Sequence, residues 1–358
     1  MTPRDRVLEA LSMRPPETPP VAIFTQSATV GMMDATGATW PEAQRDPRMM
    51  ARLGCAQAEL FGFESVRVPF DITAEAERLG CVVDLGTKDN PPNIKDRAFK
   101  VDPFEGELPD TDLLPSPDEF LADGAPTYVA EAVSIASEEW GETHPVCAGM
   151  LGPVSLLGQL IGTENFAVST MLAPEWADEW CSALTGLLEA YSGLLRDSGA
   201  DIATIVEGVA SPDVLDPGLF DGLCGRHLRT IAPKGCKTIL HICGDTEAIL
   251  DRVASSGVDA FSPDPMMDPT HVVKKMNGCV AAVGAVDPVG TLLQKAPADV
   301  VAEAHMFADA GYAVITPGCG VAPQTPDDNL SALSSAFGRL CVIIKVLRRT
   351  SKSDCSSV

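Results

Sequence analysis

The sequence predicts an α/β fold, and within that class a single (β/α)8 barrel of the TIM type. Short apolar, β-branched runs alternate with helical segments along the 358 residues, and eight strand and helix units follow one another. The strand runs are apolar almost throughout, as in parallel sheets that are covered on both faces. Several helical segments begin with a capping oxygen and a proline, as at Asp216-Pro217 and Thr325-Pro326.

The predicted strands are short runs bounded by turn residues. They cover residues 19–26, 63–71, 144–152, 200–208, 236–244, 258–264, 279–288 and 312–320. The predicted helices cover residues 42–62, 127–140, 174–198, 217–232, 246–256, 270–277, 297–310 and 326–348.

Three further segments depart from simple alternation. A leading helix is expected over Pro3–Ser12, before the first strand. An insertion over 75–126 follows the second strand and contains a predicted hairpin that pairs CVVDLG with AFKVD. We expect one barrel domain over 1–348 and a polar, disordered tail over 349–358.

Charge and hydropathy exclude some classes of partner. The chain has 50 acidic and 26 basic residues, and its net charge of -24 repels nucleic acid and anionic membrane surfaces. No apolar run approaches the roughly 18 to 20 residues of a spanning helix. The N-terminus MTPRDRVLEA lacks the apolar core of a signal peptide. We therefore expect a cytoplasmic protein that binds neither nucleic acid nor membrane.

Cysteine usage fits a reducing compartment. The 11 cysteines are scattered along the chain and odd in number, which argues against a disulfide framework. We expect most of them to be buried thiols and a few to be ligands.

Polar side chains gather where the predicted strands end. In a TIM-type barrel the loops that follow the strands converge at one face, and the chemistry lies there. The strand ends carry Gln26, Asp71, Gly152, Glu207, His241 with Cys243, Asp264, Asp287 and Cys319.

The run KTILHICGDT contains the most specific of these patterns. Residues two apart on a strand project to the same side, so His241 and Cys243 both point into the predicted barrel. Cys319, flanked by glycines in TPGCGVAPQTP, can reach the same mouth. An imidazole and two thiolates make a three-ligand zinc site with a coordination position left for a substrate. From spacing alone, a packed histidine beside a buried thiol remains an equal alternative.

The sequence resembles the uroporphyrinogen decarboxylase superfamily, and within it the methylcobamide:coenzyme M methyltransferases of methanogenic archaea. The resemblance rests on LHICGDT (240–246) and TPGCGVAPQTP (316–326). It is supported by TQSATVGMMDATGATWPEAQRDP (25–47), VPFDITAEAERLG (68–80) and GAVDPVGTLL (284–293), in consistent order over about residues 1 to 348.

This resemblance implies that zinc is held by His241, Cys243 and Cys319, which match the family's signature. It further implies transfer of a methyl group from a methylated corrinoid, carried as methyl-Co(III) on a corrinoid protein, to the thiol of coenzyme M. The products would be methyl-coenzyme M and Co(I) corrinoid, in methylotrophic methanogenesis.

Two carboxylates are candidates for a fourth metal ligand or a proton acceptor: Asp264 and Glu207. Asp264 is preferred, because the strand that it follows neighbours the strand of His241. The sulfonate of coenzyme M would need backbone amides at a helix start or an arginine such as Arg67.

Three alternatives remain at this point. A corrinoid-dependent methyltransferase could use a pterin or another thiol as acceptor. A tetrapyrrole decarboxylase would need cationic residues for several carboxylates and no metal. A corrinoid-binding scaffold would hold structural zinc, closed by a fourth protein ligand.

Overall fold

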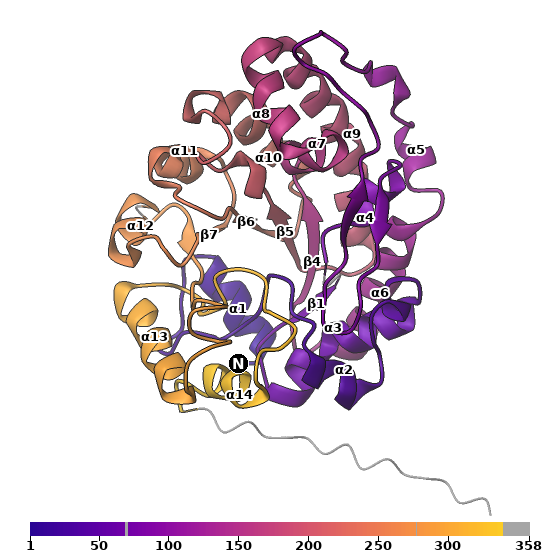
Figure 1. Ribbon diagram of the computed structural model, residues 1–358. Helices are drawn as coiled ribbons and strands as arrows, with labels where there is room; N and C mark the ends of the chain where they lie inside the picture. The colour runs from indigo at the N-terminus through magenta and orange to yellow at the C-terminus, as the bar shows by residue number, and fades with distance from the viewer. Residues whose placement is uncertain (69–70, 277, 339–358) are drawn as a thin grey trace, which may run out of the picture.

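The strands form a parallel barrel that is surrounded by helices (Figure 1). The computed structural model describes residues 1–68, 71–276 and 278–338. Six strands make one parallel sheet in the order β1-β4-β5-β6-β7-β8. They are β1 (Val66–Val68), β4 (Val146–Leu151), β5 (Ile202–Val206), β6 (Lys237–His241), β7 (Ala260–Ser262) and β8 (Ala281–Ala282). Consecutive parallel neighbours joined by helical crossovers are the pattern of this barrel class, so the predicted fold class is confirmed.

The first and eighth predicted strands close the barrel through isolated bridges instead of regular ladders. Val21 bridges Ile315 in parallel, and Val283 of the β8 region bridges Val314. The Val21 N–H donates at 3.2 Å to the Glu64 carboxylate, so a side chain takes the place of a main-chain acceptor at the closure. Both segments lie where they were predicted, but they are less regular than expected.

Helices pack around the outside of the barrel (Figure 1). Those that match predicted segments are α1 (Pro3–Leu11), α3 (Pro47–Phe61), α6 (Ala125–Trp140), α9 (Pro174–Asp197), α10 (Arg226–Ile231), α11 (Leu250–Ser255), α12 (Pro269–Met276), α13 (Pro297–Ala310) and α14 (Asp327–Ser334). Those that were not predicted are α2 (Val30–Thr36), α4 (Ala74–Arg78), α5 (Pro117–Phe120), α7 (Pro153–Ile161) and α8 (Thr163–Leu172). The end of the predicted helix 326–348 and the predicted disordered tail 349–358 lie outside the described residues.

The insertion after β1 contains a hairpin, but its second arm differs from the prediction. β2 (Val82–Asp84) pairs antiparallel with β3 (Asn93–Asp96), and AFKVD takes no part. A tight turn in which Thr87 and Asn90 exchange backbone hydrogen bonds of 3.0 and 3.1 Å returns the chain early. The predicted pairing with residues 98–102 is therefore wrong.

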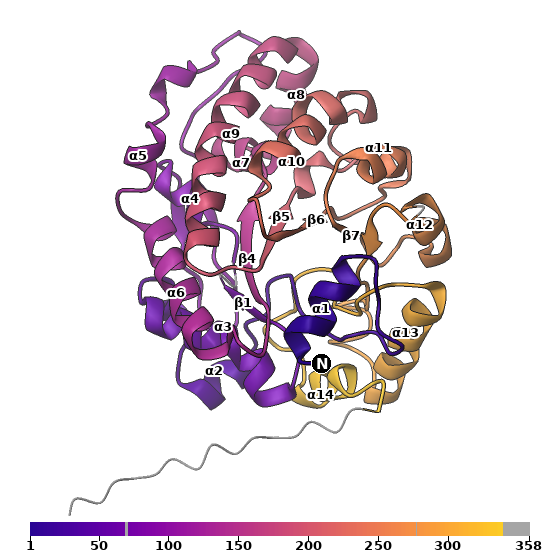
Figure 2. The same cartoon turned by 180° about the vertical axis from the view of Figure 1, so that it is seen from behind.

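Helix α1 covers the N-terminal ends of the strands (Figure 2). The Arg4 N–H donates to the Thr143 carbonyl just before β4, and Arg6 forms an ion pair of 2.6 Å with Glu64 just before β1. The apolar face of α1, with Val7, packs into a cluster that fills the barrel interior. The opposite end, where the strands finish, is left for the polar residues discussed below.

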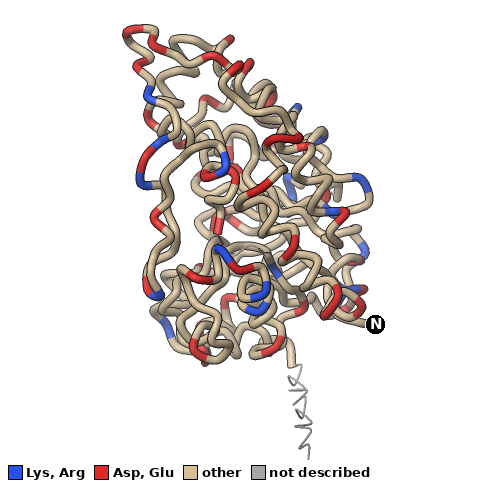
Figure 3. Tube along the Cα trace, turned by 90° about the vertical axis from the view of Figure 1, so that its right-hand side faces the viewer, with Lys and Arg blue, Asp and Glu red and all other residues tan. Residues whose placement is uncertain are grey.

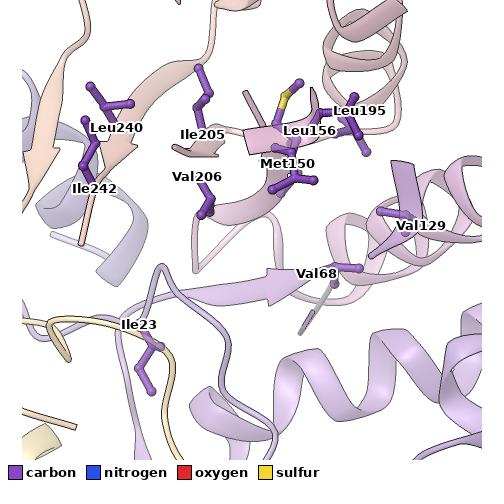
Figure 4. Packing of buried hydrophobic residues seen from close by; sticks show 14 of the residues in the cluster. Ile23, Val68, Val129, Met150, Leu156, Leu195, Ile205, Val206, Leu240 and Ile242 are labelled. Atoms are coloured by element: carbon purple, nitrogen blue, oxygen red, sulfur yellow. The ribbon is translucent and has the colours of Figure 1, made fainter. Parts of the chain in front are cut away.

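A larger apolar cluster lies between the strands and the helices, and includes Ile205, Leu240 and Ile242 (Figure 4). Acidic residues are spread over the surface and outnumber the basic ones (Figure 3). Among the described residues, no helix is both long enough and apolar enough to cross a membrane.

Candidate metal centre and its pocket

Strand β6 and the turn after it carry two of the predicted ligands. Leu240 and Ile242 belong to the outer apolar cluster, whereas Ile239 belongs to the cluster inside the barrel. By alternation His241 and Cys243 also face the interior, and His241 is 1% exposed. Buried apolar neighbours on both sides of the strand thus fix the direction of the two polar side chains.

Cys319 approaches from across the barrel, after the segment that closes it. The Thr25 hydroxyl donates to the Cys319 carbonyl at 2.8 Å and ties this turn to the first strand segment. Gly318 allows the close approach, because a Cβ there would lie 2.4 Å from Pro265.

The three predicted ligands come together. One donor atom from each of His241, Cys243 and Cys319 lies within 4.8 Å of the others. Cys243 Sγ is 3.2 Å from His241 Nε2 and 3.4 Å from Cys319 Sγ. This side chain geometry brings residues 76 positions apart into a single cluster.

The two sulfurs ionise unequally. The Cys243 thiol donates a hydrogen bond that lowers the pKa of Cys319, against the opposing effect of burial. The same hydrogen bond raises the pKa of Cys243. The arrangement therefore favours the thiolate form of Cys319 over that of Cys243, and a thiolate suits a soft cation.

Ser262 orients the imidazole, and sequence reasoning missed it. His241 Nδ1 lies 3.1 Å from both the carbonyl oxygen and the Oγ of Ser262. A carbonyl can only accept, so Nδ1 carries the proton and the lone pair of Nε2 faces the sulfurs. Such a bond commonly fixes the tautomer of a metal-ligating histidine. The donor set and the tautomer both fit zinc.

Asp264 lies beside this cluster. Its Oδ2 accepts from the Gly244 N–H at 2.9 Å, and its Oδ1 accepts from the Met266 N–H at 3.0 Å. Its charge is among the causes that raise the pKa of Cys243. Gly244 has a φ of 80°, a left-handed conformation that glycine adopts without strain and that shapes this turn.

Glu207 is differently placed. Its fully buried carboxylate accepts from the Val154 and Ser155 N–H groups at 3.2 and 2.7 Å, at the start of α7, and from the Cys224 thiol. Burial raises its pKa to about 7, although the hydrogen bonds from Ser155 and Val154 oppose this. Within the described chain, the hydrogen bonds of this carboxylate all go to α7 and Cys224 rather than to the metal cluster.

A pocket of about 670 Å³ adjoins the cluster at Cys319, and Asp264 also lies in its wall. Its outer wall is a face of α13 that sequence reasoning did not single out. Arg67, considered for the sulfonate, is fully buried and donates to the Phe24 carbonyl at 2.8 Å, so it is no part of this pocket wall.

Comparisons with known proteins extend over nearly the whole chain. A family model described as uroporphyrinogen decarboxylase (URO-D) matches residues 2–340. The methylcobamide:CoM methyltransferase MtaA of Methanosarcina barkeri is 34% identical over 337 residues, which are 94% of this chain and 97% of the relative. The methylcobamide:CoM methyltransferase MtbA of Methanosarcina mazei is 34% identical over 342 residues, covering 93% and 96%. A solved structure described as a methyltransferase from Methanosarcina mazei superposes with a TM-score of 0.85 at 32% identity, covering 94% of this chain and 98% of that one.

Proposed function

Since this chain belongs to the uroporphyrinogen decarboxylase (URO-D) family, we propose that it transfers a methyl group from a methylated corrinoid to the thiol of coenzyme M. In this proposal zinc is held by His241, Cys243 and Cys319. The observation that carries it is the set of two sulfur atoms and one imidazole nitrogen within 4.8 Å of one another at the mouth of the barrel, beside an open pocket. The names of the full-length relatives support the choice of donor and acceptor.

Bound zinc would act as a Lewis acid that favours the thiolate form of the acceptor at neutral pH, where a free alkyl thiol is mostly protonated. The protein's own residues would hold the metal and orient its ligands. Cys243 and Cys319 offer two sulfur ligands whose negative charges preserve the nucleophilicity of the bound acceptor. Ser262 holds the His241 ring in the ligating tautomer.

The atoms of the reaction balance without an outside oxidant. The acceptor sulfur forms a bond to the methyl carbon, and the Co–C bond breaks with its electron pair left on cobalt. The thiol proton needs an acceptor. We assign this role to Asp264, because it lines the same pocket as Cys319 and accepts a hydrogen bond from the Gly244 N–H, beside Cys243. Glu207 instead supports the barrel wall through α7.

The other candidate functions receive less support from the site. A tetrapyrrole decarboxylase would bind several carboxylates, yet the pocket wall carries Asp264, Asp287, Asp299 and Glu303 against Lys295. A scaffold with structural zinc would need a fourth protein ligand, whereas among the described residues the cluster has three donor groups, and one of them, Cys319, lines an open pocket. A pterin acceptor is distinguished from a thiol by methyl transfer to a folate.

The test combines metal analysis with methyl transfer. Purified protein should contain about one zinc per chain and should demethylate methylcobalamin when coenzyme M is added, with slower or no reaction with a folate. Cys243→Ala and Cys319→Ala should lose zinc and activity together. Cys279→Ala is the matched control, since that cysteine is exposed and outside the cluster.

Full zinc retention in both cluster variants would end the metal assignment. Rapid demethylation with the folate and none with coenzyme M would replace the acceptor while leaving the metal site intact.

A further inference from the structure

The pocket beside Cys319 continues as a groove along one face of α13. Asp299, Ala302, Glu303 and Met306 line it at positions i, i+3, i+4 and i+7, a spacing that places them on the same helix face. The opposite wall comes from the loops after β7 and β8, including Met266. A second hollow of about 470 Å³ shares Ala302 and Met306 with the first, so Met306 lies where the two adjoin.

This groove is too large for the acceptor. Coenzyme M is a two-carbon thiol with a sulfonate, whereas a pocket of about 670 Å³ has the volume of sites for much larger ligands. Its charge also disfavours a sulfonate, because acidic side chains outnumber the single cation, Lys295, among its lining residues.

The side chains instead suit a broad apolar ring with N–H donors at its edge. Met266 and Met306 are 67% and 48% exposed, and methionine packs adaptably against large flat ligands. The carboxylates of Asp299 and Glu303 can accept hydrogen bonds from primary amides. A methyl-Co(III) corrin combines an apolar ring face, peripheral amides and one positive charge on its metal centre.

We propose that this groove, defined by Met266, Asp299, Glu303 and Met306, seats the edge of the methylated corrin ring, with Met306 as a determinant of donor binding. The inference rests on the proposed function, since it assigns the place of the methyl donor. It also predicts the direction of approach: the donor enters from the α13 side of the mouth and meets the acceptor next to Cys319.

The test uses Met306→Lys in the zinc-loaded protein. Lysine suits an exposed helix position, but it removes the apolar contact and adds a charge of the same sign as the cobalt centre. Met171→Lys is the matched control, because Met171 is 80% exposed on α8, away from the groove. Met266→Gln, in a loop, serves as a second variant should Met306→Lys fold poorly.

Equilibrium dialysis with methylcobalamin, without coenzyme M, measures binding independently of turnover. Met306→Lys should weaken binding at least tenfold and raise the KM for methylcobalamin equally, with zinc content and the KM for coenzyme M unchanged. Met171→Lys should behave as wild type in each measurement.

The outcomes separate this inference from the proposed function. If Met306→Lys weakens methylcobalamin binding but neither wild type nor any variant transfers the methyl group, the groove is the donor site and the proposed transfer reaction is wrong. If Met306→Lys transfers the methyl group as wild type does, the groove assignment is wrong and the proposed reaction stands. The groove assignment also fails if wild type binds no methylcobalamin, or if the variant impairs transfer only from a corrinoid protein, since the groove would then contact the carrier protein.

Discussion

Replacing Glu207 with glutamine tests whether this buried carboxylate supports the fold or takes part in the chemistry. In the structure it accepts from two backbone N–H groups at the start of α7, Val154 and Ser155. The Gln side chain offers one oxygen and a donor NH2 group, so one of these two N–H groups loses its acceptor. A buried donor left without a partner costs about 1–3 kcal/mol. That is a sizeable part of the roughly 5–15 kcal/mol that stabilises a typical domain.

The raised pKa of Glu207 determines at which pH wild type is more stable than Glu207→Gln. Burial raises the pKa of Glu207 from an ordinary 4.5 to about 7. A carboxyl group whose pKa is higher in the folded state than in the unfolded state stabilises the fold. This contribution is fully present at pH values below the pKa of the unfolded state, and it is lost as the pH rises through the pKa of the folded state. The loss amounts to up to about 3 kcal/mol for a shift of this size. Wild type should therefore exceed Glu207→Gln in stability at pH 5, and the difference should vanish or reverse at pH 8.

Urea unfolding followed by tryptophan fluorescence at both pH values measures the difference. Glu75 also has a buried carboxyl with a pKa raised to about 7. Its effect on stability is the same in wild type and in Glu207→Gln, so it cancels when the two proteins are compared at each pH. Glu164→Gln, on the exposed first turn of α8, is the control and should leave both stabilities unchanged. Zinc content and methyl transfer should stay at wild-type levels. Loss of transfer with metal and fold intact would refute the assignment of Glu207 to a structural role.

Two further changes probe the metal cluster and the opposite end of the barrel. Ser262→Ala should weaken zinc binding about tenfold, because the hydroxyl helps to orient His241; competition with a chelator measures this, and unchanged affinity would remove Ser262 from the site. Arg6→Met removes the counter-charge of a buried carboxylate, Glu64, and should cost about 3–5 kcal/mol in urea unfolding without changing zinc content. A cost under about 1 kcal/mol would show that the ion pair contributes little.

The sequence was most informative where one strong pattern repeats. Strand and helix alternation predicted the barrel, and α13 was predicted with its observed bounds. Patterns were weaker where one element follows another almost directly. The apolar run of α7 begins two residues after β4 ends, and α8 begins two residues after α7 ends, so no polar break separates these elements. The closing strands could not be predicted as irregular, because the Glu64 side chain that replaces a ladder partner lies 43 residues from Val21.

The groove and the orientation of the imidazole needed the folded structure for a different reason. Ser262 and His241 are brought together by the pairing of β6 with β7, and Met306 and Cys319 come to line the same pocket only when α13 packs against the barrel. Neither arrangement has a local signal in the sequence. By contrast, the two-residue spacing of His241 and Cys243 is local, and it already placed both on the same side of a strand.

Strand pairing also accounts for the different positions of the two carboxylates. Val206 pairs with His241, and His241 pairs with Ser262; paired residues on neighbouring parallel strands project to the same face, which here is the barrel interior. Glu207 follows Val206 by one residue and so faces outward, where α7 begins. Asp264 follows Ser262 by two residues and remains on the side of the mouth. Once the pairing of the strands is known, the alternation of side chains thus separates a carboxylate that supports a helix from one that lies at the mouth of the barrel.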